Sequence, residues 1–182
     1  KYENGSWSNN IGDLYDPFNN SQTNSKLLFA NNELYISFKR PGDVFQVKKF
    51  DGNNWINIGN TGITTSIEYD LLHDGNDLLL VASYYDNTSS QIISIQRFNG
   101  SYWEIVSGSL LAQSVSDFNA TLYKDSPVIT YKDQVAQRIK VQWFSGNSWT
   151  ILDSIYISSG EGYSCDIEEY NNELYVSYQD AT

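Results

Sequence analysis

The feature that most constrains the fold is an internal repeat. An aromatic residue, a polar turn and a tryptophan recur four times, with the tryptophans 48, 48 and 46 residues apart. A second motif ends at Arg40, Asp86, Asp133 and Asp180, and these positions are 46, 47 and 47 residues apart. Two motifs that keep one period indicate a chain built from repeated supersecondary units. The first set reads KYENGSW (1–7), KFDGNNW (49–55), RFNGSYW (97–103) and WFSGNSW (143–149), ending at Trp7, Trp55, Trp103 and Trp149.

Each repeat contains four short segments with the character of strands. LLFANNELYISF is two apolar-rich runs around Asn31-Asn32, and Asn171-Asn172 repeats the arrangement. Asparagine tolerates a left-handed backbone, so both pairs predict tight hairpins. The run VFQVKKF alternates, and the Asp51-Gly52 turn leads into NWINIG. A four-stranded antiparallel sheet cannot bury both of its faces alone, but several such sheets packed radially around an axis bury their faces against one another. The sequence therefore predicts an all-β fold, a β-propeller of four-stranded antiparallel blades.

The phase of the repeat sets the expected blade boundaries within one propeller domain. In complete repeats the aromatic residue of the third strand lies 10 to 12 residues after the Arg or Asp that ends the second motif. If the two ends of the chain were placed in one blade, the spacing from Asp180 through Thr182 to Tyr2 would be only 4 residues. We interpret the chain as part of a longer array of about 5 to 8 blades, or as a subunit completed by another chain, with a four-bladed ring as the third interpretation. The expected units are the end of a blade at 1–12, complete blades at 25–60, 66–108 and 115–153, and two first strands at 163–182.

Composition excludes several classes of partner. The chain has 182 residues with 11 Lys and Arg against 22 Asp and Glu, a net charge of −11, which repels phosphate backbones. We expect no nucleic-acid partner, and no membrane span because no apolar run approaches about 20 residues. Aromatic residues make up 15% of the chain, which indicates a packed core rather than a disordered acidic tail. The lone Cys165 is expected to be a buried thiol.

Surface composition and sequons suggest a compartment. Asn-x-Ser/Thr triplets and a polar surface rich in Asn, Ser, Tyr and Gly favour a secreted or cell-surface protein. The start at Lys1, with no Met and no apolar leader, suggests a mature, trimmed or excerpted product. The triplets begin at Asn4, Asn19, Asn87, Asn99 and Asn119.

The turns carry a family resemblance. The aromatic-Asp-Gly-x-x-Trp turn at 50–55 resembles the shortened Asp-box hairpin of sialidase-like propellers and the turns of fucose-lectin propellers. Tandem repeats of this length, with Tyr-x-Asp and Gly-x-x-Trp elements, are similar to those of secreted bacterial proteins. The resemblance covers nearly the whole chain, and it implies a propeller fold more than any one function.

Loops on a rigid scaffold are the expected ligand face. The longest connection, 12–25, displays exposed aromatics beside Asp and Asn, as sugar-binding and protein-binding surfaces do. Further loops on that face are 39–44, 85–90 and 155–161. The acids that end the second motif either accept backbone N–H groups in their turns or form a ring of carboxylates with Arg40 among them. The candidate ligand-binding residues are Tyr15, Asp16, Phe18, Arg40, Asp86, Asp133 and Tyr156.

The repeated tryptophans and the inner-strand acids have two interpretations each. The tryptophans either stack on sugars or wedge between blades, and we favour the wedge because every repeat has one. The inner-strand acids either line a solvated channel or bind Ca²⁺ through their oxygens, and no other cofactor is expected. A single histidine, His73, makes transition-metal catalysis improbable. The candidate metal ligands are Asp70, Asp117, Asp166 and Glu168.

These features together predict a non-catalytic extracellular module that recognises a glycan or a surface protein. The first alternative is an assembly subunit, a homo-oligomer or part of a longer chain, completed by strand addition. The second is a glycosidase-type enzyme, since two suitably spaced carboxylates suffice for that chemistry. Sialidase-like catalysis also needs three converging arginines; we expect Arg97 and Arg138 to lie at similar places in third strands, away from the ligand face, so convergence with Arg40 is not expected.

Overall fold

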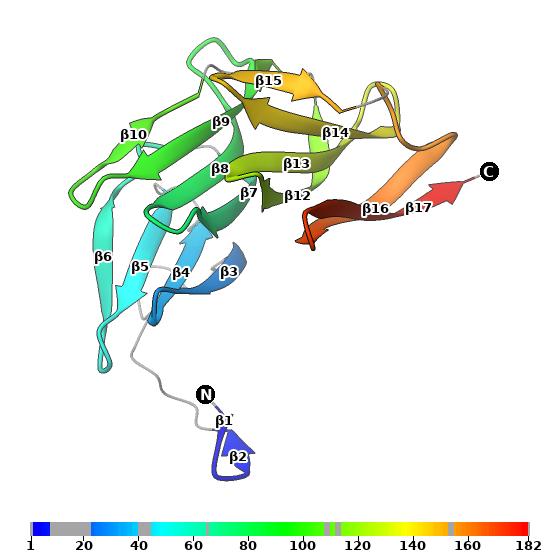
Figure 1. The fold of residues 1–182 in the computed structure, drawn as a ribbon. Helices are drawn as coiled ribbons and strands as arrows, with labels where there is room; N and C mark the ends of the chain where they lie inside the picture. The colour runs from blue at the N-terminus through cyan, green and yellow to red at the C-terminus, as the bar shows by residue number, and fades with distance from the viewer. Residues whose placement is uncertain are drawn as a thin grey trace.

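The computed structural model describes residues 2–7, 23–39, 45–64, 66–107, 110–111, 114–152 and 155–181. In these ranges the regular structure is all strand, seventeen in number, with no helix. Figure 1 shows the sheets following one another around an arc, with the N-terminal hairpin and the C-terminal sheet apart from each other. The prediction of an all-β chain is confirmed.

Three complete antiparallel sheets follow the repeat, and we name them blades 1 to 3. Blade 1 is ordered β3-β4-β5-β6, blade 2 is β7-β8-β9-β10 with the short β11 on β9, and blade 3 is β12-β13-β14-β15. The strands β16 and β17 form a two-stranded terminal sheet, and β1 and β2 form the N-terminal hairpin. The expected four-stranded blades are therefore present.

The strand bounds are as follows. The N-terminal hairpin is β1 (Tyr2–Glu3) and β2 (Ser6–Trp7), and blade 1 is β3 (Thr23–Ala30), β4 (Glu33–Lys39), β5 (Gln46–Phe50) and β6 (Trp55–Asn60). Blade 2 is β7 (Ser66–His73), β8 (Leu78–Tyr85), β9 (Gln91–Phe98), β10 (Trp103–Ile105) and β11 (Leu110–Leu111). Blade 3 is β12 (Val115–Tyr123), β13 (Ser126–Asp133), β14 (Arg138–Ser145) and β15 (Ser148–Ile151), and the terminal sheet is β16 (Glu161–Tyr170) and β17 (Glu173–Ala181).

Tight turns join the first two strands of most sheets. Asn31 and Asn32 have φ of 50° and 61°, and Asn171 and Asn172 have φ of 55° and 63°. Two successive residues with positive φ are the geometry of a type I′ turn, whose twist matches that of the strands it joins. The two hairpins predicted from the asparagine pairs are confirmed.

Every inner strand has an irregularity at the same place. The register of pairing shifts between Ser116 and Asn119 in β12 and between Tyr163 and Asp166 in β16, and β3 and β7 shift likewise near their starts. Asp117 and Ser164 each have a φ of 49° at this point. A bulge of this kind bends a strand and redirects its side chains. The repeat thus extends to the backbone of the strands that surround the centre.

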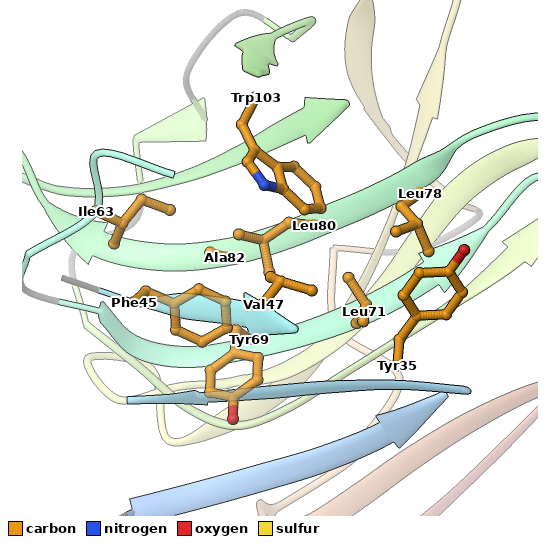
Figure 2. Close-up of a cluster of buried hydrophobic side chains, with 10 residues drawn as sticks. All are labelled: Tyr35, Phe45, Val47, Ile63, Tyr69, Leu71, Leu78, Leu80, Ala82 and Trp103. Carbon is orange, nitrogen blue, oxygen red and sulfur yellow. The ribbon is translucent and has the colours of Figure 1, made fainter. Parts of the chain in front are cut away.

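The core lies between the blades. Between blades 1 and 2 the buried cluster includes Phe45 and Val47 from one side and Leu71 and Leu80 from the other (Figure 2). A second cluster joins blade 2 to blade 3, and a third joins blade 3 to the terminal sheet. Adjacent sheets therefore bury the sides that face each other, as radial stacking requires.

The repeated tryptophans take part in this packing. The Trp103 side chain is 8% exposed, lies against Phe98, and donates its indole N–H to the Ile58 carbonyl of blade 1 at 2.9 Å. Trp55 and Trp149 pack on the aromatic residues directly opposite, Phe50 and Phe144. For Trp103 the wedge interpretation is confirmed; the Trp7 side chain lies outside the described residues.

Cys165 is buried, as expected, and burial raises the pKa of its thiol to about 11. Its Sγ donates to the Asp117 carbonyl at 2.6 Å, which ties the terminal sheet to blade 3 beside the bulge. The thiol is therefore a packing group of the inner strands.

Candidate functional site

A polar pocket of about 530 Å³ lies between blades 1 and 2. It is at the end of the blades that carries the turns between first and second strands and between third and fourth strands. We call it the interblade pocket. Its described lining residues are Asn31, Glu33, Tyr35, Lys49, Asn57, Ile58, Gly59, His73, Asn76, Asp77, Leu78, Phe98, Gly100 and Ser101.

Three side chains of blade 1 form a linked group in this pocket. Tyr35 and Lys49 stand opposite each other on β4 and β5, and both donate to the carboxylate of Glu33. The bond from Lys49, followed by that from Tyr35, holds the pKa of Glu33 below its usual value. Burial, with a further contribution from Glu33, raises the pKa of Tyr35 to about 12. The group is fixed in one arrangement, with Glu33 ionised.

Blade 2 supplies the opposite wall. His73 is the last residue of β7; its Nδ1 accepts the Gly75 N–H at 2.9 Å, and the Asn31 side-chain amide lies 3.2 Å from its Nε2. Asp77 is paired with Arg97, whose Nε lies 3.6 Å from Oδ2. The histidine therefore links the two blades across the mouth of the pocket.

The chemistry of the interblade pocket suits a neutral, hydroxyl-rich ligand. Its described lining includes two carboxylates and one ammonium group, so the formal charge is −1 with His73 neutral. Amide groups add donors and acceptors, and Tyr35 and Phe98 add aromatic surface. Ligand sites of about 300–1,000 Å³ with convergent polar groups are typical of small-molecule binding.

A second hollow, of about 630 Å³, lies at the centre of the arc. The four inner strands β3, β7, β12 and β16 all contribute to its lining. Asp70 on β7 pairs with Lys26 at 3.4 Å and accepts the Ala120 N–H at 3.1 Å, and burial raises the pKa of its carboxyl. Burial and the charge of Asp117 likewise raise the pKa of Glu68. The hollow is therefore acidic, and the Asp70 carboxylate beside it is already bonded to Lys26 and to the Ala120 N–H.

The structure spreads the predicted metal ligands along this channel. Asp117 and Asp166 line the 630 Å³ hollow, whereas Glu168 lies in an adjoining hollow of about 470 Å³, where its Oε2 accepts from Thr121 at 3.2 Å. Within the described ranges, no group of three His, Cys, Asp or Glu side chains is arranged to hold a metal ion. Calcium binding by these acids stays a prediction.

The acids that end the second strands accept backbone N–H groups. The Thr88 and Ser90 amides donate to Asp86 Oδ1 at 2.8 and 2.9 Å. Asp133 accepts from two amides of its turn, and Asp180 from the Ser159 and Gly160 amides. The hydroxyl groups of Thr88 and Ser159, followed by these backbone amides, hold the pKa of Asp86 and Asp180 below the usual range. Asp86 and Asp133 thus cap their own turns, whereas Asp180 bonds the segment that precedes β16, and a ligand role for these acids stays a prediction.

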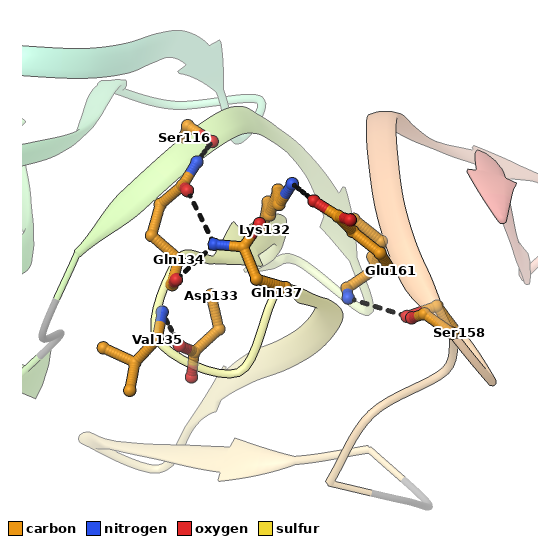
Figure 3. Close-up of polar contacts among 10 residues, drawn as sticks. Ser116, Lys132, Asp133, Gln134, Val135, Gln137, Ser158 and Glu161 are labelled. Carbon is orange, nitrogen blue, oxygen red and sulfur yellow. Dashed lines mark hydrogen bonds and ion pairs between the residues drawn. The ribbon is translucent and has the colours of Figure 1, made fainter. Parts of the chain in front are cut away.

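Two of the predicted ligand residues come together on the loop face of blade 3. Lys140 pairs with Asp133 at 2.6 Å and lies 5.0 Å from the ring centroid of Tyr156. Arg138 lies 5.7 Å from the same ring. Nearby, Lys132 pairs with Glu161 at 3.1 Å, which joins blade 3 to the terminal sheet (Figure 3). This face is a polar surface with one partly buried aromatic ring.

The other predicted ligand residues fall in segments that the structure does not describe. Tyr15, Asp16, Phe18 and Arg40 lie outside the described residues, so their roles stay predictions. The expectation that Arg97 and Arg138 occupy similar places was wrong. Arg97 is near the end of β9, beside the interblade pocket, whereas Arg138 begins β14 on the loop face. The two residues therefore lie at opposite ends of their blades.

The interblade pocket was not predicted from the sequence. Its residues come from five separate segments, and the pocket exists only because two blades stack. One available signal was the pair Glu33 and Lys49, opposite charges on neighbouring strands of one repeat.

Comparisons with known proteins support the fold. No protein-family model matches the chain, and no curated protein matches its sequence. Among solved structures, the chain is similar to an exo-β-1,3-galactanase from Phanerochaete chrysosporium solved with β-1,3-galactotriose, at a TM-score of 0.54 and 10% identity. The match covers 87% of this chain and 43% of that chain, so this chain spans less than half of its structural neighbour. The neighbour is a propeller glycosidase, and the fold of this chain is a β-propeller.

The described part of the chain includes no helix with the length and apolar character needed to span a membrane.

Proposed function

We propose that this chain is a non-catalytic extracellular recognition module that binds a neutral glycan in the interblade pocket. The observation that carries the proposal is the pocket itself, about 530 Å³ and lined by carboxylate, ammonium, amide and aromatic groups. Sugar hydroxyls both donate and accept, so they match such a lining, and the apolar face of a sugar ring can lie on Tyr35 or Phe98.

The state of the carboxylates supports binding rather than hydrolysis. Glycoside hydrolysis needs one carboxyl group that keeps its proton near neutral pH. Glu33 has a lowered pKa because Lys49 and Tyr35 donate to it, and Asp77 is paired with Arg97. Glu33 is therefore not suited to protonate a leaving group. A screen with chromogenic glycosides should therefore show no turnover, and turnover that depends on Glu33 would contradict this part of the proposal.

The binding test uses side chains that line the pocket without a structural partner role. The first probe is β-1,3-galactotriose, because the structural neighbour was solved with it, and a glycan array follows. Asn57 and Asn76 are exposed lining residues of opposite blades, so Asn57→Ala and Asn76→Ala should each weaken binding about tenfold, equivalent to about 1.4 kcal/mol. Isothermal titration calorimetry measures the loss.

A matched control separates the two ends of the blade. Asn87 is exposed in the turn after β8, on the loop face, so Asn87→Ala should leave binding unchanged. The double change Tyr15→Ala and Phe18→Ala tests the alternative that the 12–25 loop holds the ligand, without loss of thermal stability. If only that double variant loses binding, the site is the loop face and the interblade pocket is excluded.

A further inference from the structure

Two hollows of the molecule share one wall. Asn31 and His73 line the interblade pocket, and they also line the hollow of about 470 Å³. The Asn31 side-chain amide lies 3.2 Å from His73 Nε2, so this wall is a polar contact between the first turns of two blades. We call the second hollow the axial hollow; the other polar side chains of its described lining are Thr121, Glu168 and Glu169.

The axial hollow lies where the first turns of the sheets meet. The inner strands β3, β7, β12 and β16 follow one another along the inside of the arc (Figure 1). Each contributes to the hollow close to its last residue, as Ala30 does on β3, His73 on β7 and Leu122 on β12. The interblade pocket is at this same end of the blades. A ligand can therefore extend from one hollow into the other without crossing a blade.

The interblade pocket is elongated along blade 1. Each strand of that blade has a lining residue on it or directly after it: Asn31 follows β3, Tyr35 is on β4, Lys49 on β5 and Asn57 on β6. Neighbouring strands are about 4.8 Å apart, so the lining extends over roughly 14 Å from the inner to the outer strand. The axial hollow continues beyond β3 toward β12 and β16. A single sugar ring does not fill a groove of this length.

The axial hollow offers the same kinds of contact as the interblade pocket. Thr121 Oγ1 donates to Glu168 Oε2 at 3.2 Å, which places a hydroxyl and a carboxylate side by side. Leu72 and Leu122 add apolar surface, and Phe29 adds an aromatic ring. Sugar hydroxyls donate and accept hydrogen bonds, and one face of a sugar ring is apolar. Both hollows therefore suit the same class of ligand.

The shared wall keeps polar groups for a ligand. An asparagine amide has two N–H donors and an oxygen that accepts two bonds, and the contact with His73 uses one of these. Asn31 is exposed, so its other donors and acceptors face solvent above the wall. A hydroxyl group or glycosidic oxygen that crosses from one hollow to the other meets a partner there.

From these observations we propose that the interblade pocket and the axial hollow form one binding groove for an unbranched neutral oligosaccharide. The sugar chain runs from the outer strand of blade 1, across the contact between Asn31 and His73, to Thr121 and Glu168 on the inner strands. A side branch within the pocket would meet blade 1 or blade 2, which wall it on both sides. This inference rests on the proposed function and adds the length and linearity of the glycan.

The length of the sugar chain is the variable that tests the groove. The probes are unbranched oligomers of β-1,3-linked galactose, β-1,4-linked glucose and β-1,4-linked mannose, each from the disaccharide to the hexasaccharide. The disaccharide occupies the interblade pocket, and longer chains reach the axial hollow. In the series that binds, the affinity should rise by about tenfold or more from disaccharide to hexasaccharide, because the added sugars gain hydrogen bonds. Isothermal titration calorimetry measures both lengths.

Variants separate the two halves of the groove. Glu168→Gln and Thr121→Val keep the size of the side chain and change a polar group of the axial hollow. Each should weaken hexasaccharide binding by about three- to tenfold and leave disaccharide binding unchanged, which also shows that the variant is folded. Asn57→Ala should weaken both lengths. The control is Ser25→Ala, at the other end of β3 in the hollow of about 630 Å³, which should change neither.

Asn31→Gly tests the shared wall. Asn31 has a φ of 50°, which glycine adopts without strain, so this change keeps the turn and removes the side chain. Because the sugar that crosses the wall loses its partner, the hexasaccharide should lose about threefold more affinity than the disaccharide. Equal losses at both lengths would contradict a chain that crosses at this point.

The outcomes distinguish this inference from the proposed function. Binding that depends on Asn57 but not on chain length, Thr121 or Glu168 would overturn the groove and leave the proposed function intact. Equal losses at both lengths in Glu168→Gln would place the short chain in the axial hollow, which also overturns the groove. If none of the three series binds, the proposed function fails for these sugars and the groove is rejected with it.

Discussion

Blade 1 and the terminal sheet use almost the same eight residues in two different environments. In β4 the Tyr35 side chain is 7% exposed and Phe38 is 1% exposed. In β17 the corresponding Tyr175 and Tyr178 are 52% and 36% exposed. Both strands follow an asparagine turn and pair with an inner strand. The sequence of a hairpin therefore determines its strands and turn, while burial depends on the next strand and the next blade.

The tyrosines show the same contrast in their electrostatics. Burial is the main cause that raises the pKa of Tyr35 to about 12, with the bond to Glu33 second. For Tyr175 the hydrogen bond to Glu173 is the main cause of a raised pKa, and burial is second. The local hydrogen bond is thus a property of the Glu-Leu-Tyr sequence, whereas desolvation is supplied by blade 2.

The largest expected difference between the two regions is in the cost of removing the tyrosine. Tyr35→Ala should destabilise the fold by about 3 kcal/mol, because it opens a cavity in the cluster between blades 1 and 2. Tyr175→Ala should cost less than about 1 kcal/mol, because its ring is exposed. Urea denaturation of both variants at one low protein concentration measures the pair.

Equal costs for the two variants would break this comparison, because they would mean that the Tyr175 ring is covered in the folded protein.

The fold was predictable because its signals are local and repeated. The Asn31-Asn32 and Asn171-Asn172 turns, and the aromatic to tryptophan turns at 50–55 and 98–103, each specify a hairpin within a few residues. A repeated unit also limits the architectures that bury both faces of a sheet. The pattern therefore gave the blades without any knowledge of contacts between them.

The site was less predictable because it depends on contacts between blades. Glu33 and Lys49 belong to one blade, but His73 and Asp77 reach the same pocket only through the stacking of blade 2 on blade 1. Asp86 and Asp133 illustrate the reverse case. Their sequence position could not distinguish a ligand from a turn cap, and the structure shows that backbone N–H groups of their turns are directed at them, while a ligand role stays a prediction.

A medium effect is expected where the terminal sheet is attached to blade 3. A Cβ at Gly162 would overlap Ile139 Cγ1 and lie 2.8 Å from its Cδ1, in a buried contact. Gly162→Ala should therefore cost about 1–3 kcal/mol through overpacking. Thermal denaturation measures this, with Ser177→Ala on the exposed side of β17 as a control within about 0.5 kcal/mol of the parent. A neutral Gly162→Ala would mean that the terminal sheet is free on both faces.

The smallest effect concerns the carboxylate group that the two regions share. The lowered pKa of Glu33 means that its ionised form is favoured by folding, so its contribution is complete above its unfolded pKa and is lost as pH falls through its folded pKa. The Glu33 and Lys49 side chains are each 37% exposed, so Glu33→Gln should cost no more than about 1 kcal/mol at pH 7. The difference from the parent should shrink between about pH 5 and pH 3.

The measurement is the denaturation midpoint of each variant between about pH 5 and pH 3. Glu173→Gln is the matching variant in the terminal sheet. It removes only the bond from Tyr175, so at pH 7 it should cost less than Glu33→Gln. If the two variants cost the same, Lys49 adds nothing to the group in blade 1.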